Sequence, residues 1–188
     1  MKLSKTLLAT ALAAGILGGG IMGSPAMAAP SFDPAAAPVE QRQEAFTTVA
    51  DLDQTQIDNA RTIIGVGRGG ALPDQGIVIA LMTAMQESSM YNLDYGDRDS
   101  LGLFQQRPSM GWGAPEQVTD PVYASKSFYG INPEGSNPGL IQINGWESMA
   151  PTQAAQAVQR SAYPDAYAKW EPLARELLAA QGDAPAIP

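Results

Sequence analysis

Residues 77–85 are Ile-Val-Ile-Ala-Leu-Met-Thr-Ala-Met, a run with an apolar side chain at almost every position. A helix at the surface of a globular protein carries its apolar side chains on one face, whereas a helix that is apolar on every face is buried. Pro73 and Asp74 precede the run as helix-starting residues, and the pattern continues to about Met90. We therefore predict one helix here, buried at the centre of the fold.

The flanking segments carry further helix signals and almost no strand signals. Helices are expected from Thr55 through Ile64 up to the glycine-rich residues 65–70, from Asp120-Pro121 to Gly130, from Pro151 through Val158, and from Pro164 to about Ala180 with a bend at Pro172. Alternation of apolar and polar residues is nearly absent, and at most a small β-hairpin fits around residues 101–106. The predicted fold class is therefore mainly α, in a single domain.

The N-terminus has the features of an export signal. Lys2 and Lys5 precede an apolar run, and residues 26–28, Ala-Met-Ala, form a small-residue cleavage sequence. The apolar run is short and interrupted by glycines, so an uncleaved membrane anchor is the less favoured alternative. We predict that residues 1–28 are a signal peptide. Its removal leaves no stable membrane anchor and places the mature protein outside the cytoplasm, in the cell envelope or secreted.

Composition divides the remainder of the chain into three parts. Residues 29–50 are rich in Ala and Pro and are predicted to be a partly disordered linker. Residues 182–188 have a similar composition and are predicted to be a disordered tail. The domain is therefore expected over residues 51–181. The oligomeric state does not follow from these patterns.

The amino-acid composition removes several classes of function. The chain contains no Cys and no His, which excludes a cysteine protease, a Ser-His-Asp triad and a zinc site built from these residues. We expect no metal and no cofactor. Without residues 1–28 the chain has nine basic and nineteen acidic residues, a net charge of −10, so it has no electrostatic attraction for nucleic acid. Carboxylates are the groups that remain for hydrolytic chemistry.

Glu87 is the first candidate for that chemistry. It lies near the C-terminal end of the apolar helix, and Ala80 and Ala84 share its helix face. A carboxyl beside small apolar side chains is partly desolvated, which favours its neutral form and raises its pKa. A carboxylic acid that is still protonated near neutral pH can protonate a glycosidic oxygen. The alternative is a glutamate at a helix end whose carboxyl simply reaches water.

The residues around Glu87 resemble the catalytic motif of a known superfamily. Glu87 and Ser88 are followed by Gly-Leu-Phe-Gln at residues 102–105, whose glycine comes 15 positions after the glutamate. This pattern resembles the Glu-Ser and Gly-Leu-Met-Gln motifs of the lysozyme-like superfamily, in particular the soluble lytic transglycosylases. The resemblance is best over residues 73–130. It implies a lysozyme-like fold and an enzyme that cleaves peptidoglycan glycan strands between N-acetylmuramic acid and N-acetylglucosamine.

The resemblance also implies roles for individual side chains. Glu87 would act as the general acid and then as the base. Ser88 would form a hydrogen bond close to it, and Gln105 would line the groove for the sugar. The family's Ala-Tyr-Asn motif has a counterpart in Ala-Tyr-Pro at residues 162–164. Tyr163 is therefore the candidate for the tyrosine that helps to position the acid, Glu87.

Trp112 and the loop before Gly102 hold the remaining candidates. Trp112 lies between two glycines and is predicted to stack on a sugar in the groove. Asp97 and Asp99 are candidates for the second carboxylate that a hydrolase uses as base or nucleophile. A solvated polar loop and a Ca²⁺ site are the alternatives for residues 92–99, although the spacing and the bidentate glutamate of an EF-hand are absent.

The sequence leaves three functions open. No second carboxylate stands out, so the favoured function is that of a lytic transglycosylase, in which the sugar's own hydroxyl attacks and leaves an anhydro end. A muramidase-type hydrolase that uses Asp97 or Asp99 is the first alternative. A catalytically inactive lysozyme-fold module that binds glycan or a protein is the second.

Overall fold

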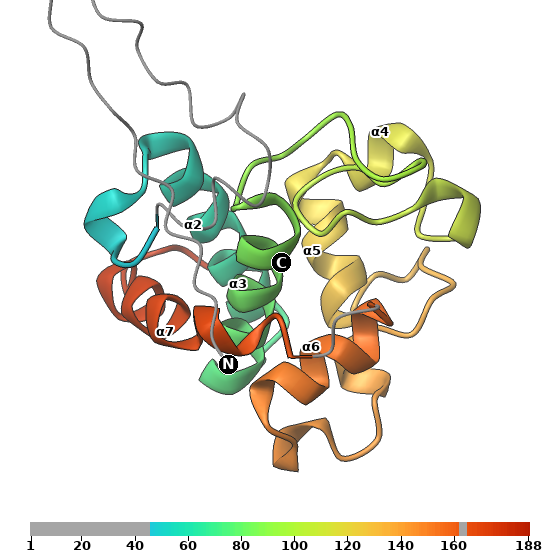
Figure 1. The fold of residues 1–188 in the computed structure, drawn as a ribbon. Helices are drawn as coiled ribbons and strands as arrows, with labels where there is room; N and C mark the ends of the chain where they lie inside the picture. Colours follow the sequence, from blue (N-terminus) through green and yellow to red (C-terminus); the bar gives the residue numbers. More distant parts are fainter. Residues whose placement is uncertain (1–45, 162–164) are drawn as a thin grey trace, which may run out of the picture. The chain divides into compact units, whose positions relative to one another are not determined.

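The computed structural model describes residues 46–161 and 165–188, and this part of the chain is mainly helical, as predicted (Figure 1). The α-helices are α2 (Gln54–Gly69), α3 (Asp74–Ser88), α4 (Pro115–Val118), α5 (Pro121–Tyr129), α6 (Pro151–Gln159) and α7 (Glu171–Ala180). Short 3-10 segments are η1 (Val49–Asp51), η2 (Pro108–Met110), η3 (Leu140–Gln142), η4 (Trp146–Ser148) and η5 (Ala168–Trp170). The predicted signal peptide, most of the predicted linker and Tyr163 lie outside the described residues.

α3 is the central helix, as its sequence predicts (Figure 1). It packs against α2, α5, α6 and α7, and every side chain from residue 77 to 85 is at most 1% exposed. Thr83, the hydroxyl within this run, donates a hydrogen bond to the backbone oxygen of Ile79 at 2.7 Å, so it is satisfied inside the helix. Because α3 is apolar on all sides, it is stable only where other helices cover each face.

α2 differs from its predicted bounds at both ends. Asp53, rather than Thr55, is the N-cap. The carboxylate of Asp53 accepts from the backbone N–H of Gln56, and the Gln56 side chain accepts in return from the backbone N–H of Asp53, both at 2.9 Å. The helix also continues to Gly69, through the glycines where the sequence predicts a stop.

The glycine-rich end of α2 is covered by residues 182–188. The disordered tail expected from composition is therefore replaced by a packed segment. The backbone N–H of Ile187 donates to the backbone oxygen of Gly65 at 2.8 Å. A Cβ on Gly65 would lie 2.6 Å from the backbone oxygen of Pro185, and a Cβ on Gly69 would overlap the backbone of Ile187. The two glycines, four residues apart on one helix face, allow this close approach.

The domain begins earlier than predicted, and its last helix begins later. Phe46 is 6% exposed and belongs to the core, so residues 46–50 are part of the packed domain and not of the linker. α7 begins at Glu171, with Pro172 in its first turn. A proline there interrupts no helical hydrogen bond, so it starts the helix and does not bend it.

α5 begins and ends as the sequence predicts. Asp120 caps it by accepting from the backbone N–H of Tyr123 at 2.7 Å, and Gly130 ends it with a left-handed φ of 83°. The ring of Phe128 stacks on Phe104 with the centroids 4.7 Å apart. This contact joins α5 to residues 101–106, called the 101–106 turn below.

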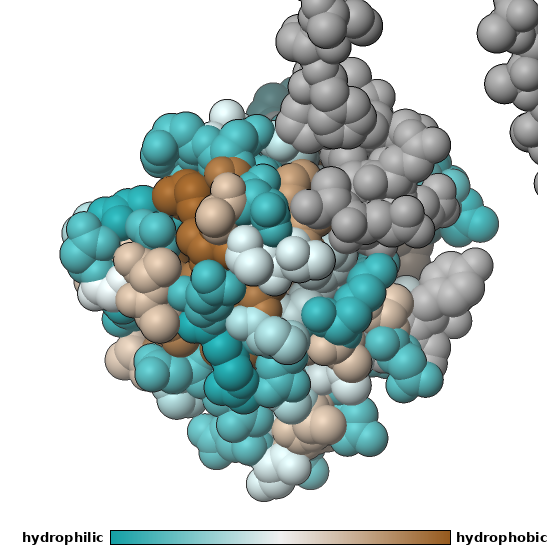
Figure 2. All heavy atoms as spheres, turned by 60° about the vertical axis from the view of Figure 1, so that its left-hand side comes forward, coloured by the Kyte–Doolittle hydropathy of each residue, from teal (hydrophilic) through white to brown (hydrophobic). Residues whose placement is uncertain are grey.

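Extended pairing in the described residues is limited to one antiparallel bridge between Leu101 and Gln106, where the sequence allows a small hairpin. The face in Figure 2 is mostly hydrophilic, with apolar atoms exposed over a limited area. Large hydrophobic side chains are exposed at three of the described positions, Tyr95, Met110 and Ile141. Among the helices of the described part, none is long and apolar enough to cross a membrane.

Candidate functional site

Glu87 lies in the last turn of α3, where the buried helix reaches the surface. Its side chain is partly exposed, whereas Ser88 and Ser89 after it are fully buried. Ser89 ends the helix with a left-handed φ of 54°. The apolar body of α3 therefore holds the Glu87 carboxyl at the rim of the core, between the interior and solvent.

The hydroxyl of Tyr167 donates a hydrogen bond to Oε1 of Glu87 at 2.7 Å. Tyr167 immediately precedes η5 and is fully buried, so the core fixes the position of its ring. Burial, together with the Glu87 carboxylate, raises the pKa of the Tyr167 hydroxyl well above its ordinary value. The hydroxyl therefore keeps its proton and remains a donor toward Glu87.

Gln159, at the end of α6, is a second hydrogen-bond partner of Glu87. Its side-chain amide also donates to the backbone oxygen of Phe104 at 2.9 Å, so α3, α6 and the 101–106 turn meet at this point. Burial raises the pKa of the Glu87 carboxyl, and the hydrogen bonds from Tyr167 and Gln159 lower it in part. The net shift is upward, so Glu87 keeps its proton to a higher pH than an exposed glutamate does.

Ser88 bonds to the backbone and not to the carboxyl. Its buried hydroxyl lies 2.9 Å from the backbone oxygen of Leu103 and 3.1 Å from that of Ala84. The resemblance implies a hydrogen bond of Ser88 near Glu87, and the partners that the structure gives its hydroxyl are these two backbone oxygens, at the joint between α3 and the 101–106 turn. That joint holds the turn beside the carboxyl.

The glycine and the glutamine of the second motif have separate roles. Gly102 has a φ of 75°, and a Cβ there would overlap the backbone oxygen of Val118, so only glycine fits. Gln105 is partly exposed, and its amide nitrogen lies 3.2 Å from the backbone oxygens of Tyr95 and Gly102. Gln105 thereby ties residues 92–100, called the 92–100 loop below, to the turn. Its predicted contact with a sugar stays a prediction.

Asp99 holds the 92–100 loop in place. Its carboxylate accepts from Nε of Arg107 at 2.6 Å and from the backbone N–H of Ser109 at 2.7 Å. Hydrogen bonds from Ser109 and Arg107 lower the pKa of Asp99 well below its ordinary range, so it stays ionised. Asp97 differs, since its side chain is 90% exposed.

The described residues contain no group of three or more His, Cys, Asp or Glu side chains that could hold a metal ion. The Ca²⁺ alternative for the 92–100 loop therefore gains no support from the geometry. Asp99 already has protein donors on both carboxylate oxygens, and Asp97 approaches only Arg98, at 3.9 Å.

The tryptophans lie in different surroundings. Trp146 and Trp170 are buried in the core. Trp170 also donates from its indole N–H to the side chain of Gln86 at 2.9 Å, which fixes the residue before Glu87. Trp112 is partly exposed and packs against the core with the rest of its ring. It remains available for the predicted stacking on a sugar.

Tyr167 and Gln159 are site residues that are not predicted from the sequence. The pair Ala-Tyr occurs twice, ending at Tyr163 and again at Tyr167 four positions later. The family motif favours the first copy, which lies outside the described residues, and the structure brings the second copy to Glu87. The repeated Ala-Tyr pair is the feature of the sequence that points to Tyr167. No comparable feature points to Gln159, because an amide at the end of an Ala-rich helix is an ordinary surface feature.

Together these contacts form a partly buried carboxyl with a raised pKa, held by a tyrosine hydroxyl and a glutamine amide. Such a group holds its proton to a higher pH than an exposed glutamate and can both donate and accept it, which is the requirement for general acid–base chemistry. Comparison with models of protein families finds no match, and comparison with curated protein sequences finds none either.

Proposed function

We propose that this chain is an extracytoplasmic enzyme that cleaves the glycan strand of peptidoglycan between N-acetylmuramic acid and N-acetylglucosamine. It acts as a lytic transglycosylase of lysozyme-like fold, with Glu87 as its single acid and base. The observation that carries the proposal is the partly buried Glu87 carboxyl, whose pKa is raised and which accepts from Tyr167 at 2.7 Å. The resemblance of residues 73–130 to that superfamily supports the substrate class, and residues 1–28 support the location.

The proposed reaction needs one group that first donates and then accepts a proton. Neutral Glu87 donates its proton to the glycosidic oxygen, and the bond from that oxygen to the anomeric carbon of the muramic acid unit breaks. The carboxylate of Glu87 then accepts the proton of the primary hydroxyl of the same sugar, whose oxygen bonds to the anomeric carbon. An anhydro ring closes, no water is consumed and Glu87 returns to its neutral form. Hydrogen bonds from Tyr167 and Gln159 stabilise the carboxylate between the two steps.

The surroundings of the two aspartates favour this reaction over hydrolysis. A muramidase-type hydrolase needs a second carboxylate that is free to act as base or nucleophile. The carboxylate of Asp99 is occupied by Arg107 and Ser109. Asp97 is surrounded by solvent. An inactive binding module, the other alternative, would not need the Glu87 carboxyl to be held by both Tyr167 and Gln159.

Mass spectrometry of the soluble products tests the proposal. The purified protein is incubated with peptidoglycan from several bacterial sources, and we expect fragments with anhydro ends, lighter by one water than hydrolysis products. Fragments with reducing ends would instead identify a hydrolase. No release from any source would leave a binding module. The Glu87→Gln variant, incubated in parallel, controls for a contaminating enzyme and should release fragments at least about a hundredfold more slowly.

A further inference from the structure

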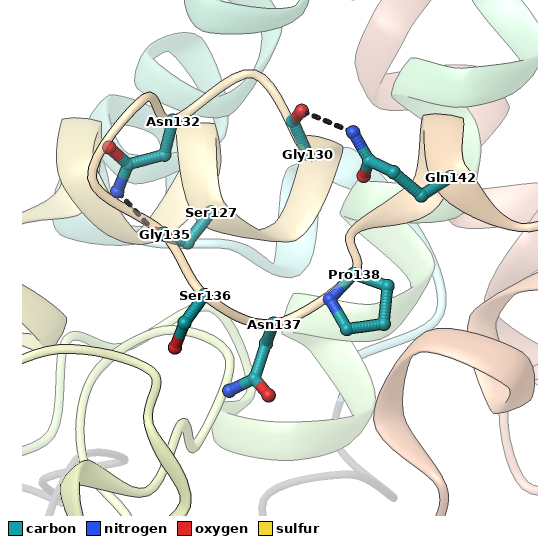
Figure 3. A pocket seen from close by; sticks show the side chains of 8 residues that line it. All are labelled: Ser127, Gly130, Asn132, Gly135, Ser136, Asn137, Pro138 and Gln142. Carbon is teal, nitrogen blue, oxygen red and sulfur yellow. Dashed lines mark hydrogen bonds between the residues drawn. The ribbon is translucent and has the colours of Figure 1, made fainter.

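Side-chain hydrogen bonds join separate segments of the chain at two ends of the fold. At the C-terminal end of α5, the side-chain amide of Asn132 donates to the hydroxyl of Ser127 at 2.8 Å (Figure 3). The amide of Gln142 donates to the backbone oxygen of Gly130, also at 2.8 Å. These bonds line a cavity of about 340 Å³ and hold residues 131–139 and η3 to the helix. Their partners are uncharged, so the bonds act on structure alone.

A second pair of bonds, at the C-terminal end of α3, differs because one of the bonded groups is the Glu87 carboxyl. The hydroxyl of Tyr167 donates to Oε1 of Glu87 at 2.7 Å. The indole N–H of Trp170 donates to Oε1 of Gln86 at 2.9 Å. Residues 167–170, called the 167–170 turn below, are therefore bonded to two consecutive residues of α3.

The two donors belong to one rigid piece of backbone. A 3-10 helix has three residues per turn, so the side chains at positions i and i+3 lie on the same side of it. The backbone N–H of Trp170 donates to the backbone oxygen of Tyr167 at 3.0 Å, and Tyr167 has helical backbone angles, with φ −78° and ψ −27°. The hydroxyl and the indole N–H therefore move together when the turn moves.

The two acceptors on α3 point in different directions. Consecutive residues of an α-helix lie about 100° apart around its axis. A bond to Glu87 alone would let the 167–170 turn pivot about that contact, and the second bond, to Gln86, removes this freedom. Tyr167 is fully buried and Trp170 is 3% exposed, so packing keeps both rings beside α3. The indole N–H thereby fixes the orientation of the turn.

The bond between Tyr167 and Glu87 is sensitive to small displacements. Hydrogen bonds between a hydroxyl and an oxygen acceptor span roughly 2.5–3.0 Å and weaken steeply as they bend. A displacement of the hydroxyl by about 0.5 Å takes the 2.7 Å bond beyond this range. Because the bond lowers the pKa of Glu87 against the effect of burial, its geometry influences the protonation of the carboxyl.

We propose that Trp170 is a positioning residue: its bond to α3 holds the 167–170 turn so that the Tyr167 hydroxyl stays on the Glu87 carboxyl. The value of this positioning for a reaction rests on the proposed function, whereas the positioning itself does not. The indole N–H bonds to Gln86 and not to the carboxyl, so its effect on Glu87 passes through Tyr167.

Charged side chains do not account for the pKa of Glu87. Burial raises it, and the hydrogen bonds from Tyr167 and Gln159 lower it in part. The 101–106 turn carries no charged residue. The charged side chains after α6, on the 167–170 turn and on α7 are all at least partly exposed: Arg160, Asp165, Lys169, Glu171, Arg175 and Glu176. Nζ of Lys169 lies 5.1 Å from the centroid of the Trp170 ring, so a substitution there has to keep an aromatic ring.

An NMR titration of the Glu87 carboxyl tests the proposal without a substrate. The full chain is labelled with ¹³C at its glutamate carboxyls, and the Glu87 resonance is identified by its loss in Glu87→Gln. Loss of a hydrogen bond to a carboxylate changes its pKa by about 1–2. Trp170→Phe keeps an aromatic ring but has no donor, so it loosens that bond and should raise the pKa of Glu87 by about 0.5. An unchanged or lowered pKa would overturn the proposal.

A second variant and a control separate positioning from a general loss of packing. Gln86→Leu keeps the indole and removes its acceptor, so it should raise the pKa of Glu87 by a similar amount, and it decides the test if Trp170→Phe does not fold. Trp146→Phe makes the same exchange at the opposite end of α3, where a Cβ on Gly76 would lie 3.2 Å from the Trp146 ring. It should leave the pKa unchanged, and an equal rise in this control would contradict the assignment.

A double variant shows whether Trp170 acts through the tyrosine. In the Tyr167→Phe background no hydroxyl remains to be positioned, so Trp170→Phe should cause no further change in the pKa of Glu87. A further rise of about 0.5 would mean that the indole acts on Glu87 by another route, and would overturn the proposal. Because these titrations use no peptidoglycan, failure of the proposed function would appear only in the analysis of cleavage products.

Discussion

Glu87 and Asp99 carry the same functional group, and their surroundings move its pKa in opposite directions. At the rim of the core, burial raises the pKa of Glu87. On the 92–100 loop, hydrogen bonds from Ser109 and Arg107 lower the pKa of Asp99. The Glu87 carboxyl thereby keeps a proton that it can donate to a higher pH than an exposed glutamate does, and the Asp99 carboxylate remains a charged acceptor that holds a loop. The environment of a carboxyl group, and not its residue type, therefore separates a candidate acid from a structural carboxylate.

The largest expected effect comes from Glu87→Gln. Gln keeps the size and the hydrogen-bonding shape of Glu but has no acidic proton to give to the glycosidic oxygen. General acid–base catalysis contributes roughly 10²–10⁴-fold to a rate, so release of glycan fragments should fall by about this factor. The measurement is the initial rate of fragment release from peptidoglycan. Wild-type activity in this variant would show that Glu87 is not the acid.

The stability of the same variant checks that its fold is intact and that the carboxyl is desolvated. An unfolded glutamate titrates at about pH 4.3. Because the folded pKa of Glu87 lies above that of the unfolded chain, ionisation costs the wild type stability as the pH rises past this value. Glu87→Gln escapes this cost, so its free energy of unfolding relative to wild type should increase from pH 4 to pH 7. Urea denaturation at both pH values measures the change, and a decrease would contradict the raised pKa.

Tyr167→Phe is expected to have an intermediate effect. A hydrogen bond to a charged group contributes about 1.5–3 kcal/mol, so loss of the donor should lower kcat by roughly tenfold or more. The hydrogen bond lowers the pKa of Glu87, so its removal raises that pKa further. Activity requires protonated Glu87, and the alkaline limb of the pH–rate profile should therefore move to higher pH.

Tyr129→Phe is the matched control for that change. Tyr129 is equally buried, and its hydroxyl donates to the backbone oxygen of Ile63 at 3.0 Å. Its loss should cost about 1 kcal/mol of stability without moving the alkaline limb. If the alkaline limb of the pH–rate profile moves equally in both variants, or in neither, the Tyr167 hydroxyl does not lower the pKa of Glu87.

Asp99→Asn should have the smallest effect on activity, a loss of less than about tenfold, because a single-carboxylate reaction does not use it. The stability of the fold should fall. The folded pKa of Asp99 lies below the unfolded value of about 3.9, so its ionised form stabilises the wild type above that pH. The deficit of the variant in free energy of unfolding should be present at pH 7 and should shrink as the pH falls below about 4.

Asp97→Asn is the control on the same loop, because its side chain is 90% exposed. Neither activity nor stability should change. Loss of most activity in Asp97→Asn or in Asp99→Asn, with the fold intact, would identify the second carboxylate of a hydrolase. Glu87 would then not be the single catalytic carboxylate.

The parts of the fold that follow from local pattern agree with the structure. The apolar run of residues 77–85 gives the buried helix α3, and the cap at Asp120 with Gly130 gives α5. The misplaced parts depend on distant contacts. Composition makes residues 182–188 look like the linker, but glycines on α2 leave room for them to pack.

The site residues also fall into those that follow from local sequence and those that depend on distant contacts. Glu87 follows from its place at the end of an apolar helix, whereas its partner Tyr167 comes from 80 residues further along the chain. A contact over such a distance leaves no periodicity or spacing in the sequence. The likeness to a short motif favours Tyr163 instead, because a motif records order along the chain and not position in space.

By itself, the sequence determined a helical chain around a buried α3 and the location of a candidate acid at its end, because periodicity and composition act through near neighbours. Only the tertiary structure decided which side chains hold that acid and which carboxylate is tied to a loop. The physical reason is that a pKa depends on the burial and the donors around the group. For Glu87 these donors come from α6 and from the residue before η5, and for Asp99 from Arg107 and Ser109.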